Sequence, residues 1–520
     1  MSFKRLDKRL PRRSRLFAAI VILILFTASC TPGVQTRPPA SSATAATEPM
    51  DAKTPEPTVP PATPTTSPPA RNPLTGLEVA DETLLDLPAV LVSISTFPVI
   101  ARPQSGLSFA PYVFEFYITK GSTRFLAAFY GEFPEPENPP AGNCQVRREP
   151  FVQTGFILGN RVWLDENQNN LQDAWERGIG GVCINLYDPN GNLLAQTSTD
   201  SNGYYGFNVE EGEYFIEVER PDGMAFAQKN VEDEEKDSDV DQDSGWSDAL
   251  YVASSHLSLD AGLILPSKPL PAPELPPARV GPVRSGRLIY RYLADTFESS
   301  CLIYAYASGE VLEQLPYCAF VDHNIQGGGY MLDVSEMIEL ANKRREPMVR
   351  QYYSAYTFTD DPPKGGVSAV NLRIYYAYLN QTGWVYDPLS QSWWRYVDEV
   401  NEKTAGILHP EIDRLTGRQL QFENVVVLFT EHDVISPTNL DIRLDRDRTG
   451  KALLFRDGRM YEIQWSVRAE TPIQFQTGDG ASFPLKPGKT WVAIVTPETT
   501  VTESKPGEWL VRFHEPTASE

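Results

Sequence analysis

The chain has 520 residues and is strongly acidic, with 46 Lys and Arg against 68 Asp and Glu and a net charge of −22. This balance argues against nucleic acid and anionic membrane surfaces as partners, because both repel a negatively charged protein. Beyond the N-terminal segments described next, roughly 450 residues remain, enough for two to four domains with their own cores.

Residues 1–29 have the pattern of a signal peptide. A basic stretch from Lys4 to Arg15 precedes an uncharged apolar run at residues 16–26. This run is about half as long as a transmembrane helix needs, so a cleaved signal is favoured over a permanent span. The small residues 27–29 before Cys30 resemble the lipobox of bacterial lipoproteins. The resemblance implies a diacylglycerol on Cys30 that anchors the protein to the outer face of the cytoplasmic membrane, at the cell surface. An ordinary signal peptide or an uncleaved anchor is the alternative.

The segment after Cys30 is rich in Pro, Thr, Ala and Ser and has almost no large apolar side chains to bury. It therefore predicts an extended tether rather than a fold. Two more proline-rich stretches, 133–150 and 266–277, indicate linkers. The expected organisation is a signal peptide (1–29), the lipidated Cys and its disordered tether (30–71), a first core part (72–133), a linker (134–154), an inserted sandwich (155–263), a proline-rich linker (264–278), a second core part (279–400), a C-terminal β domain (401–498) and a tail (499–520).

Short strands are predicted inside the insert. Alternating apolar runs at 182–187, 204–209 and 214–218 are separated by Asn-Gly and Glu-Gly pairs, which favour tight turns. This pattern is typical of an antiparallel meander and predicts a β-sandwich. Four separated motifs, GNRVWLD, ERGIGGV, TDSNGYY and DSD, then resemble the B-repeat of serine-aspartate-repeat (SdrD-type) surface adhesins. The resemblance implies a calcium-binding, immunoglobulin-like stalk or spacer on a cell surface.

The first of these motifs leads into a loop with the spacing of a calcium site. Counting from Asp165 as position one, polar side chains recur at positions three, five, nine and twelve, and a backbone carbonyl falls at position seven. Position six, usually Gly, is Asn170, which tolerates a left-handed backbone. The flanks read as strand and loop, unlike the two helices of an EF-hand. A solvated turn without metal is the alternative. The candidate ligands are Asp165, Asn167, Asn169, Leu171, Asp173 and Glu176.

A second acidic segment follows later in the insert. Asp237, Asp239, Asp241 and Asp243 alternate, and an extended strand would place all four carboxylates on one side. Asp200 opens another polar turn together with Asn202. We expect further calcium at these residues, because carboxylates aligned on one side of a strand would repel one another strongly without a cation. A disordered acidic loop is the alternative.

The segments on either side of the insert resemble one known family. The motifs NPLTGL, ARPQSGL and GSTRF before the insert and VGPVRSGR after it are similar to YerB-type lipoproteins, whose core is a domain of unknown function. In that family the Arg-Phe strand leads directly into the Gly-Pro-Val-Arg-Ser segment, so the insert is expected to split an α+β domain. The later motifs NVVV, RDG, IQW and LKPGKTW resemble the family's second domain and predict an all-β unit. The predicted fold class is therefore multidomain and mainly β.

Charged residues in the family-like segments need partners. Arg102, Glu115, Arg124 and Arg284 lie beside glycines or in apolar strands. We expect one internal ion-pair network that joins the halves of the split domain. The functional alternative is an anionic ligand or peptide carboxylate held by the arginines in a cleft.

Four cysteines remain besides Cys30. Export makes disulfides feasible, and three full pairings exist. We favour Cys301 with Cys318 and Cys144 with Cys183, with free thiols as the alternative.

No catalytic motif stands out. The histidines lack metal-ligand spacing, and Glu431-His432-Asp433 is expected to be a solvated turn after a strand. The aromatic residues Trp384, Tyr386, Trp393 and Trp394 are expected in the core, with a binding patch for sugar or peptide as the alternative. The sequence therefore favours a binding or scaffolding protein of the cell envelope with a calcium-stabilised spacer. Its partners would be the membrane, through the lipid, and a cell-wall polymer or envelope protein. A cell-wall-directed hydrolase with an unrecognised carboxylate pair is the alternative.

Overall fold

The computed structural model describes residues 69–137, 140–146, 151–231, 235–266, 275–316, 318–321, 329–346 and 348–517. The predicted signal peptide, Cys30 and nearly all of the tether lie outside these residues. Within them, no helix combines the length and the apolar character needed to cross a bilayer.

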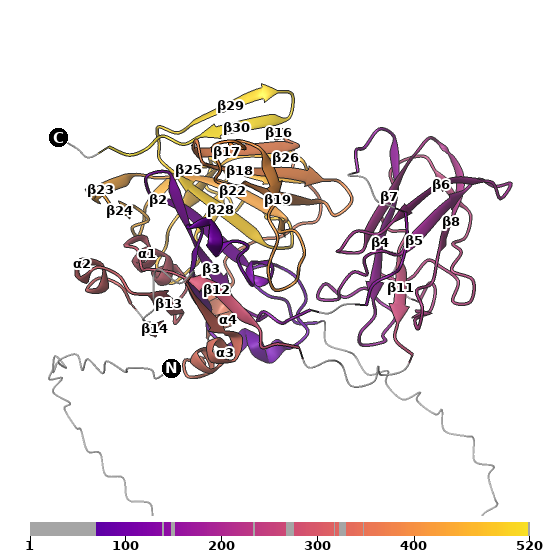
Figure 1. The fold of residues 1–520 in the computed structure, drawn as a ribbon, viewed down its shortest axis with the longest axis horizontal. Coiled ribbons are helices and arrows are strands. Elements are labelled where there is room, and N and C mark those ends of the chain that lie inside the picture. Colours follow the sequence, from indigo (N-terminus) through magenta and orange to yellow (C-terminus); the bar gives the residue numbers. More distant parts are fainter. Residues whose placement is uncertain are drawn as a thin grey trace, which may run out of the picture. The chain divides into compact units, whose positions relative to one another are not determined.

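A 13-stranded mixed sheet forms the larger part of the core (Figure 1). Its backbone order is β14-β13-β1-β3-β2-β28-β22-β25-β26-β16, with β12, β15 and β27 attached beside it. The central strands are apolar on both faces and fully buried, as expected for a sheet that is covered on both sides. The strands are β1 (Val90–Ser95), β2 (Tyr112–Thr119), β3 (Ser122–Phe129), β12 (Arg279–Val283), β13 (Cys301–Ala305), β14 (Ala319–Val321), β15 (Tyr330–Asp333), β16 (Val367–Ser368), β22 (Asn424–Phe429), β25 (Thr449–Arg456), β26 (Arg459–Ser466), β27 (Gln474–Gln476) and β28 (Thr490–Val495).

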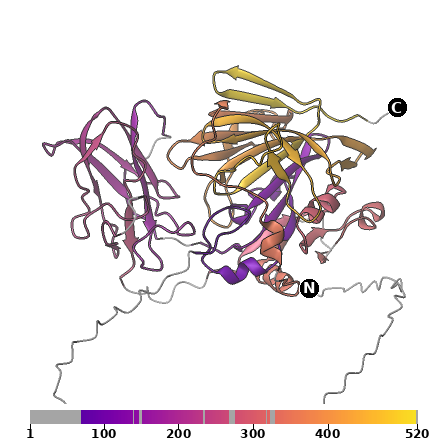
Figure 2. The same ribbon diagram turned by 180° about the vertical axis from the view of Figure 1, so that it is seen from behind.

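Strands from before and after the insert share this sheet. β1 pairs with β3 on one side and with β12 and β13, which follow the insert, on the other. β2 pairs in parallel with β28, from Tyr112 opposite Thr490 to Phe116 opposite Ile494. Figure 2 shows from behind how the indigo strands lie against the orange and yellow ones. The insert thus separates, along the chain, strands that pair with one another in a single sheet.

A seven-stranded sheet packs against the first. Its order is β20-β19-β18-β17-β30-β29, with β21 beside β19. Trp384 of this sheet meets Trp491 of β28 with ring centroids 5.3 Å apart, so both sheets share one apolar core. The strands are β17 (Asn371–Ala377), β18 (Asn380–Asp387), β19 (Ser392–Asp398), β20 (Leu408–Pro410), β21 (Gln421–Phe422), β29 (Thr500–Lys505) and β30 (Glu508–Arg512); a separate hairpin pairs β23 (His432–Ser436) with β24 (Asn439–Ile442).

This second sheet differs from two expected boundaries. β19 pairs with β20 across the boundary expected between residues 400 and 401. The segment 499–520, expected as a tail, contains β29 and β30, and β30 pairs in parallel with β17. The strands of this segment are short, and β29 is mostly exposed, so apolar and polar residues alternate only weakly along its sequence. Val511 is nevertheless fully buried, which ties the segment to the core.

Helices are few and short, and they belong to the part of the core that follows the insert. Ile289, Tyr290 and Leu293 of the first α-helix are buried in the core. This arrangement agrees with the α+β character predicted for the split domain. The helices are α1 (Ile289–Thr296), α2 (Gly309–Leu312), α3 (Val334–Asn342) and α4 (Val349–Tyr353), with 3₁₀ turns η1 (Glu82–Asp86), η2 (Val99–Ala101) and η3 (Leu107–Phe109).

The insert is a sandwich of two four-stranded sheets. One sheet has the order β10-β8-β5-β6 and the other β7-β4-β11-β9, and each pairs only strands of the insert. Their inner faces enclose a separate apolar core that includes Ile184, Tyr205 and Leu263. The predicted immunoglobulin-like sandwich is therefore confirmed. The strands are β4 (Phe156–Leu164), β5 (Cys183–Tyr187), β6 (Leu193–Ser198), β7 (Tyr204–Val209), β8 (Gly212–Val218), β9 (Ala225–Phe226), β10 (Leu250–Val252) and β11 (Ala261–Ile264).

Candidate functional site

The loop that follows β4 brings two carboxylates into its interior. Asp165 comes directly after β4, and its two oxygens accept the backbone N–H groups of Asn169 at 3.1 Å and Asn170 at 2.9 Å. Glu176 accepts the N–H groups of Glu166 at 2.8 Å and Asp173 at 3.1 Å. The Asp165 and Glu176 residues are each only 2% exposed. The first and twelfth loop positions therefore face inward together.

The residues between them complete a tight polar turn. Asn170 has φ +64°, the left-handed conformation expected at the sixth position. The side-chain amides of Asn167 and Asn169 donate to the same oxygen of Asp173, at 2.7 and 3.1 Å. Leu171 forms an isolated β-bridge with Asp237, which brings the second acidic segment beside the loop. All six candidate ligands therefore belong to one folded loop.

Burial makes the negative charge of this loop costly. Desolvation raises the pKa of Glu176 to about 7, although two backbone N–H groups oppose the shift and Asp165 and Asp173 add to it. Desolvation likewise raises the pKa of Asp165. Carboxylate and amide oxygens are the donors that a hard cation such as Ca²⁺ requires. As arranged, no three His, Cys, Asp or Glu side chains of the described residues could hold a metal on their own, so amide and carbonyl oxygens would have to contribute.

The alternating aspartates do not share one side, as an extended strand would require. Asp237 is buried, whereas Asp241 and Asp243 are exposed in a turn closed by the Gly245 N–H on the Asp241 carbonyl at 2.8 Å. The Asp241 side chain accepts the N–H groups of its own turn. The turn interrupts the strand, so the expectation of four aligned carboxylates is wrong. Asp200 accepts the N–H groups of Asn202 and Tyr204 at 2.8 and 2.9 Å and so stabilises a local turn.

Asp260 is a buried carboxylate that the sequence analysis missed. It is fully buried, accepts the Arg161 N–H at 2.8 Å, and donates its own N–H to Asp239 at 2.7 Å. Desolvation raises its pKa well above the usual range, and Asp239 and Asp237 raise it further. The signal in the sequence that could have identified Asp260 was its position between Leu259 and Ala261 in an apolar segment.

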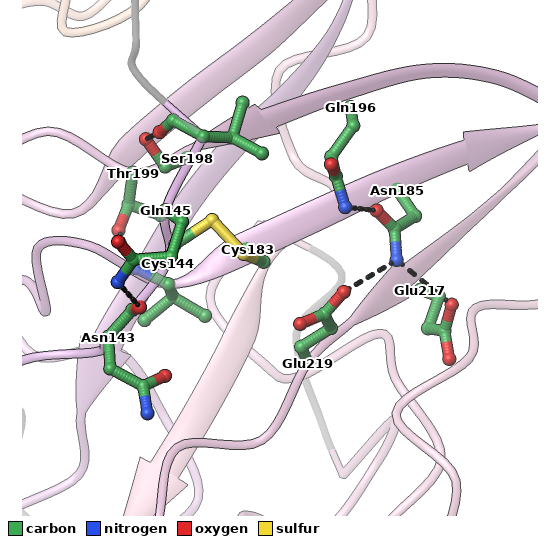
Figure 3. The surroundings of a disulfide bond; sticks show 12 residues. Asn143, Cys144, Gln145, Cys183, Asn185, Gln196, Ser198, Thr199, Glu217 and Glu219 are labelled. Carbon is green, nitrogen blue, oxygen red and sulfur yellow. Dashed lines mark hydrogen bonds between the residues drawn. A yellow bond between two sulfur atoms is a disulfide. The ribbon is translucent and has the colours of Figure 1, made fainter.

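Two disulfides join the four described cysteines. Cys144 is bonded to Cys183, the first residue of β5, with Cα atoms 5.1 Å apart (Figure 3). The backbone N–H groups of Gly142 and Cys144 also donate to Gly180 and Gly181, so this part of the linker belongs to the sandwich. Cys301 of β13 is bonded to Cys318, again with Cα atoms 5.1 Å apart.

Glu115 takes part in an ion-pair network different from the one expected. Its Oε2 accepts the Arg395 guanidinium at 3.0 Å, and the Nε of Arg395 donates to Glu411. The Arg395 guanidinium also lies 3.9 Å from the Trp491 ring centroid. Burial opposes the charged form of Arg395, but Glu115 and Glu411 raise its pKa overall. The side chains of Glu115, Arg395 and Glu411 are at most 3% exposed. The two carboxylates are therefore buried in the core and bound to the arginine between them.

The three predicted arginines have other partners, so the expected single network is wrong. Arg102 donates to the backbone oxygens of Thr96 at 3.2 Å and Asp398 at 2.7 Å. Arg124 donates to the carbonyl of Ser285 at 3.1 Å, and Arg284 donates to the carbonyl of Phe97 at 3.4 Å. Arg395, which sequence reasoning missed, is the charged partner of Glu115, and it also pairs with Glu411.

His432 is not in a solvated turn. It begins β23, is only 8% exposed, and its Nδ1 lies 2.8 Å from the Thr430 carbonyl. Desolvation lowers its pKa to about 4. Its pairing with Ile442 in the β23–β24 hairpin explains the burial.

Fold and site together define a multidomain, mainly β protein in which an adhesin-like sandwich interrupts a larger core. Three family models match the chain: "SdrD B-like domain" at residues 156–263, and the N-terminal and C-terminal domains of "Protein of unknown function (DUF3048)" at 74–153 and 372–492. The chain thus combines an SdrD B-like domain with both DUF3048 domains, as the sequence motifs predicted.

Curated relatives match a short part of the chain. Serine-aspartate repeat-containing protein F of Staphylococcus epidermidis is 43% identical over 101 residues, which cover 19% of this chain and 6% of that protein. Serine-aspartate repeat-containing protein I of Staphylococcus saprophyticus is 45% identical over 80 residues, covering 14% and 4%. The chain therefore spans less than a tenth of these relatives. Among solved structures, the YerB protein of Bacillus subtilis is 18% identical with a TM-score of 0.44, covering 82% of this chain and 96% of that one.

Proposed function

We propose that the protein is a binding or scaffolding protein of the cell surface, tethered by a lipid on Cys30, in which the insert is a calcium-stabilised spacer. The SdrD B-like match and the surface-adhesin relatives of the insert support this role. The partner would be a cell-wall polymer or an envelope protein, bound by the DUF3048 core. The tether would separate the folded domains from the membrane.

The observation that carries the proposal is the pair of buried carboxylates in the loop of the insert. Asp165 and Glu176 are shielded from water and lie in the same loop as Asp173. Without a cation, their mutual repulsion and desolvation oppose the folded loop. Ca²⁺ held by these carboxylates, the amides of Asn167 and Asn169, and the Leu171 carbonyl would neutralise the charge.

Differential scanning calorimetry of the full chain tests the proposal, because the insert and the remainder have separate apolar cores. Calcium at about a hundred times its dissociation constant should stabilise the insert by about 2.7 kcal/mol. Chelator should lower the melting temperature of the insert and leave that of the DUF3048 core unchanged.

Three variants sharpen this experiment. Glu176→Gln should weaken calcium binding more than Asn169→Ala, because the closing carboxylate supplies charge and two oxygens. Glu213→Gln, at an exposed position on β8, is the matched control and should bind like the parent protein. A calcium-loaded protein whose insert melts identically in excess chelator would refute the spacer's dependence on calcium.

A further inference from the structure

A cavity of about 590 Å³ lies at the edge of the large sheet where β2 begins. At this edge Tyr112 of β2 lies opposite Ala128, near the end of β3, and opposite Thr490, the first residue of β28. The segments that leave β3 and enter β28 therefore both reach the cavity, and they bring Glu132 and Lys489 to it. Sites that enclose small ligands have volumes of this size.

A close turn after β3 positions Glu132 at the cavity. Gly131 has φ +75°, and a Cβ atom there would lie 2.6 Å from the Asn72 Nδ2, so the turn requires glycine. The Glu132 side chain is exposed, and its carboxylate has no partner among the described residues. Desolvation by the surrounding protein nevertheless raises its pKa to about 7, and Lys489 opposes the shift. A cationic group of a ligand would favour the charged carboxylate.

Lys489 provides the opposite charge on the other side of β2. Its backbone N–H donates to the Glu423 Oε2 at 2.6 Å, and its Nζ donates to the Ser108 carbonyl at 2.9 Å. An ammonium group has three donor hydrogens, so two remain for other acceptors. No carboxylate in the described part of the chain forms an ion pair with Lys489. The ammonium group is therefore held in place and able to bind an anionic group.

The arginines that line the cavity already have partners. Arg418 and Arg177 form ion pairs with glutamates. Arg161 donates to one side-chain and two backbone oxygens, all of them neutral. Glu132 and Lys489 thus remain as two opposite charges that a ligand could compensate.

Apolar side chains also line the cavity. They include Phe109 of η3, Pro111, and Trp175 from the loop after β4 of the insert. Ligand sites combine such apolar walls with a few polar groups that fix the ligand's orientation. A matching ligand has an ammonium group, a carboxylate and an apolar body. A peptide of a few residues has all three, whereas a phosphate or a neutral sugar does not.

We propose that this cavity binds a short peptide with free ends, whose ammonium group pairs with Glu132 and whose carboxylate pairs with Lys489. The apolar walls receive its side chains. The assignment rests on the binding role proposed above and names the class of ligand that the DUF3048 core recognises.

Isothermal titration calorimetry of the full chain tests this site with the tripeptide Ala-Phe-Ala and with its N-acetylated and C-amidated forms. The free tripeptide should bind saturably. Each blocked form should bind about tenfold or more weakly, because one charge-assisted hydrogen bond is lost. The blocked peptides probe both charges in the parent chain, so this comparison does not depend on the folding of a variant.

Two variants assign each charge to its residue. Glu132→Gln should bind the free and acetylated tripeptides equally, and Lys489→Met should bind the free and amidated tripeptides equally. Glu498→Gln is the matched control, because Glu498 is exposed just beyond the far end of β28. It should discriminate between the peptides like the parent chain. Circular dichroism checks that each variant folds.

The proposal is overturned if the free tripeptide does not bind, or if the blocked forms bind as tightly as the free one. It is also overturned if Glu132→Gln discriminates between the peptides as Glu498→Gln does. Chelator-dependent melting of the insert, measured on the same protein, reports separately on the proposed calcium-stabilised spacer. A failure of peptide binding is therefore distinguishable from a failure of the proposed function.

Discussion

At the residue scale, the Arg395 guanidinium holds together two carboxylates from distant parts of the chain, Glu115 and Glu411. It lies between Glu115 and Glu411 and over Trp491, with all three charged side chains removed from water. Burial raises the pKa of Glu115, and Arg395 opposes that shift. Replacing Arg395 alone would therefore leave the carboxylates of Glu115 and Glu411 without their compensating charge.

Arg395→Met should destabilise the core by about 3–5 kcal/mol in urea unfolding, because breaking a buried ion pair strands its partners. Arg373→Met, on β17 of the same sheet, should cost much less, since Arg373 donates to uncharged oxygens. Replacing all three charged residues by Leu, Met and Leu should recover most of the lost stability. Equal losses in the single and triple variants would show that the charges are not the cause.

The sequence indicated which residues were unusual but not always their partners. Glu115 stood out as a charge in an apolar strand, and Asn170 as a left-handed turn residue. The partner of Glu115 lies 280 positions away, and no local pattern links the two. Asp165 and Glu176 were easier to relate, because one loop places both, and their spacing reflects its geometry.

At the scale of elements, a strand could be predicted from the sequence where apolar and polar residues alternate strongly along it. The sandwich strands were foreseen because apolar residues alternate between Gly-containing turns. β29 was missed because an exposed edge strand has little alternation, and β30 was missed because its pairing with β17 depends on the whole core. The 237–243 segment shows the opposite error, since alternating aspartates suggested a strand where a turn forms.

The disulfide between the linker and β5 gives a prediction at this scale. Cys144 and Cys183 are separated by 39 positions, and a closed loop of this length stabilises a fold by about 2–4 kcal/mol. Cys183→Ser should therefore lower the melting temperature of the insert under oxidising conditions and leave the transition of the core unchanged. Cys301→Ser is the reciprocal control and should affect the core alone. An unaltered insert transition in the Cys183 variant would contradict this assignment.

At the scale of the whole molecule, the proposed surface attachment depends on Cys30, which lies outside the described structure. Expressed in a bacterial host, the wild-type protein should partition into the detergent phase after Triton X-114 separation. Cys30→Ala should abolish lipidation and detergent partitioning of the mature form. Ser29→Ala, which keeps a small residue before the cysteine, should behave like the wild type. A Cys30→Ala protein that is still cleaved before residue 30 and remains membrane-bound would rule out the lipid anchor.

The pairing of β2 with β28 has a consequence for biosynthesis. A ribosome delivers β2, which ends at Thr119, long before β28, which begins at Thr490. At roughly 10 residues per second, the unpaired edge of β2 waits tens of seconds for its neighbour. During this interval the sandwich, whose strands pair only with one another, is able to complete its fold, while the core strands on either side remain open. Nascent chains of this protein should therefore depend on holdase chaperones until β28, close to the end of the chain, has emerged.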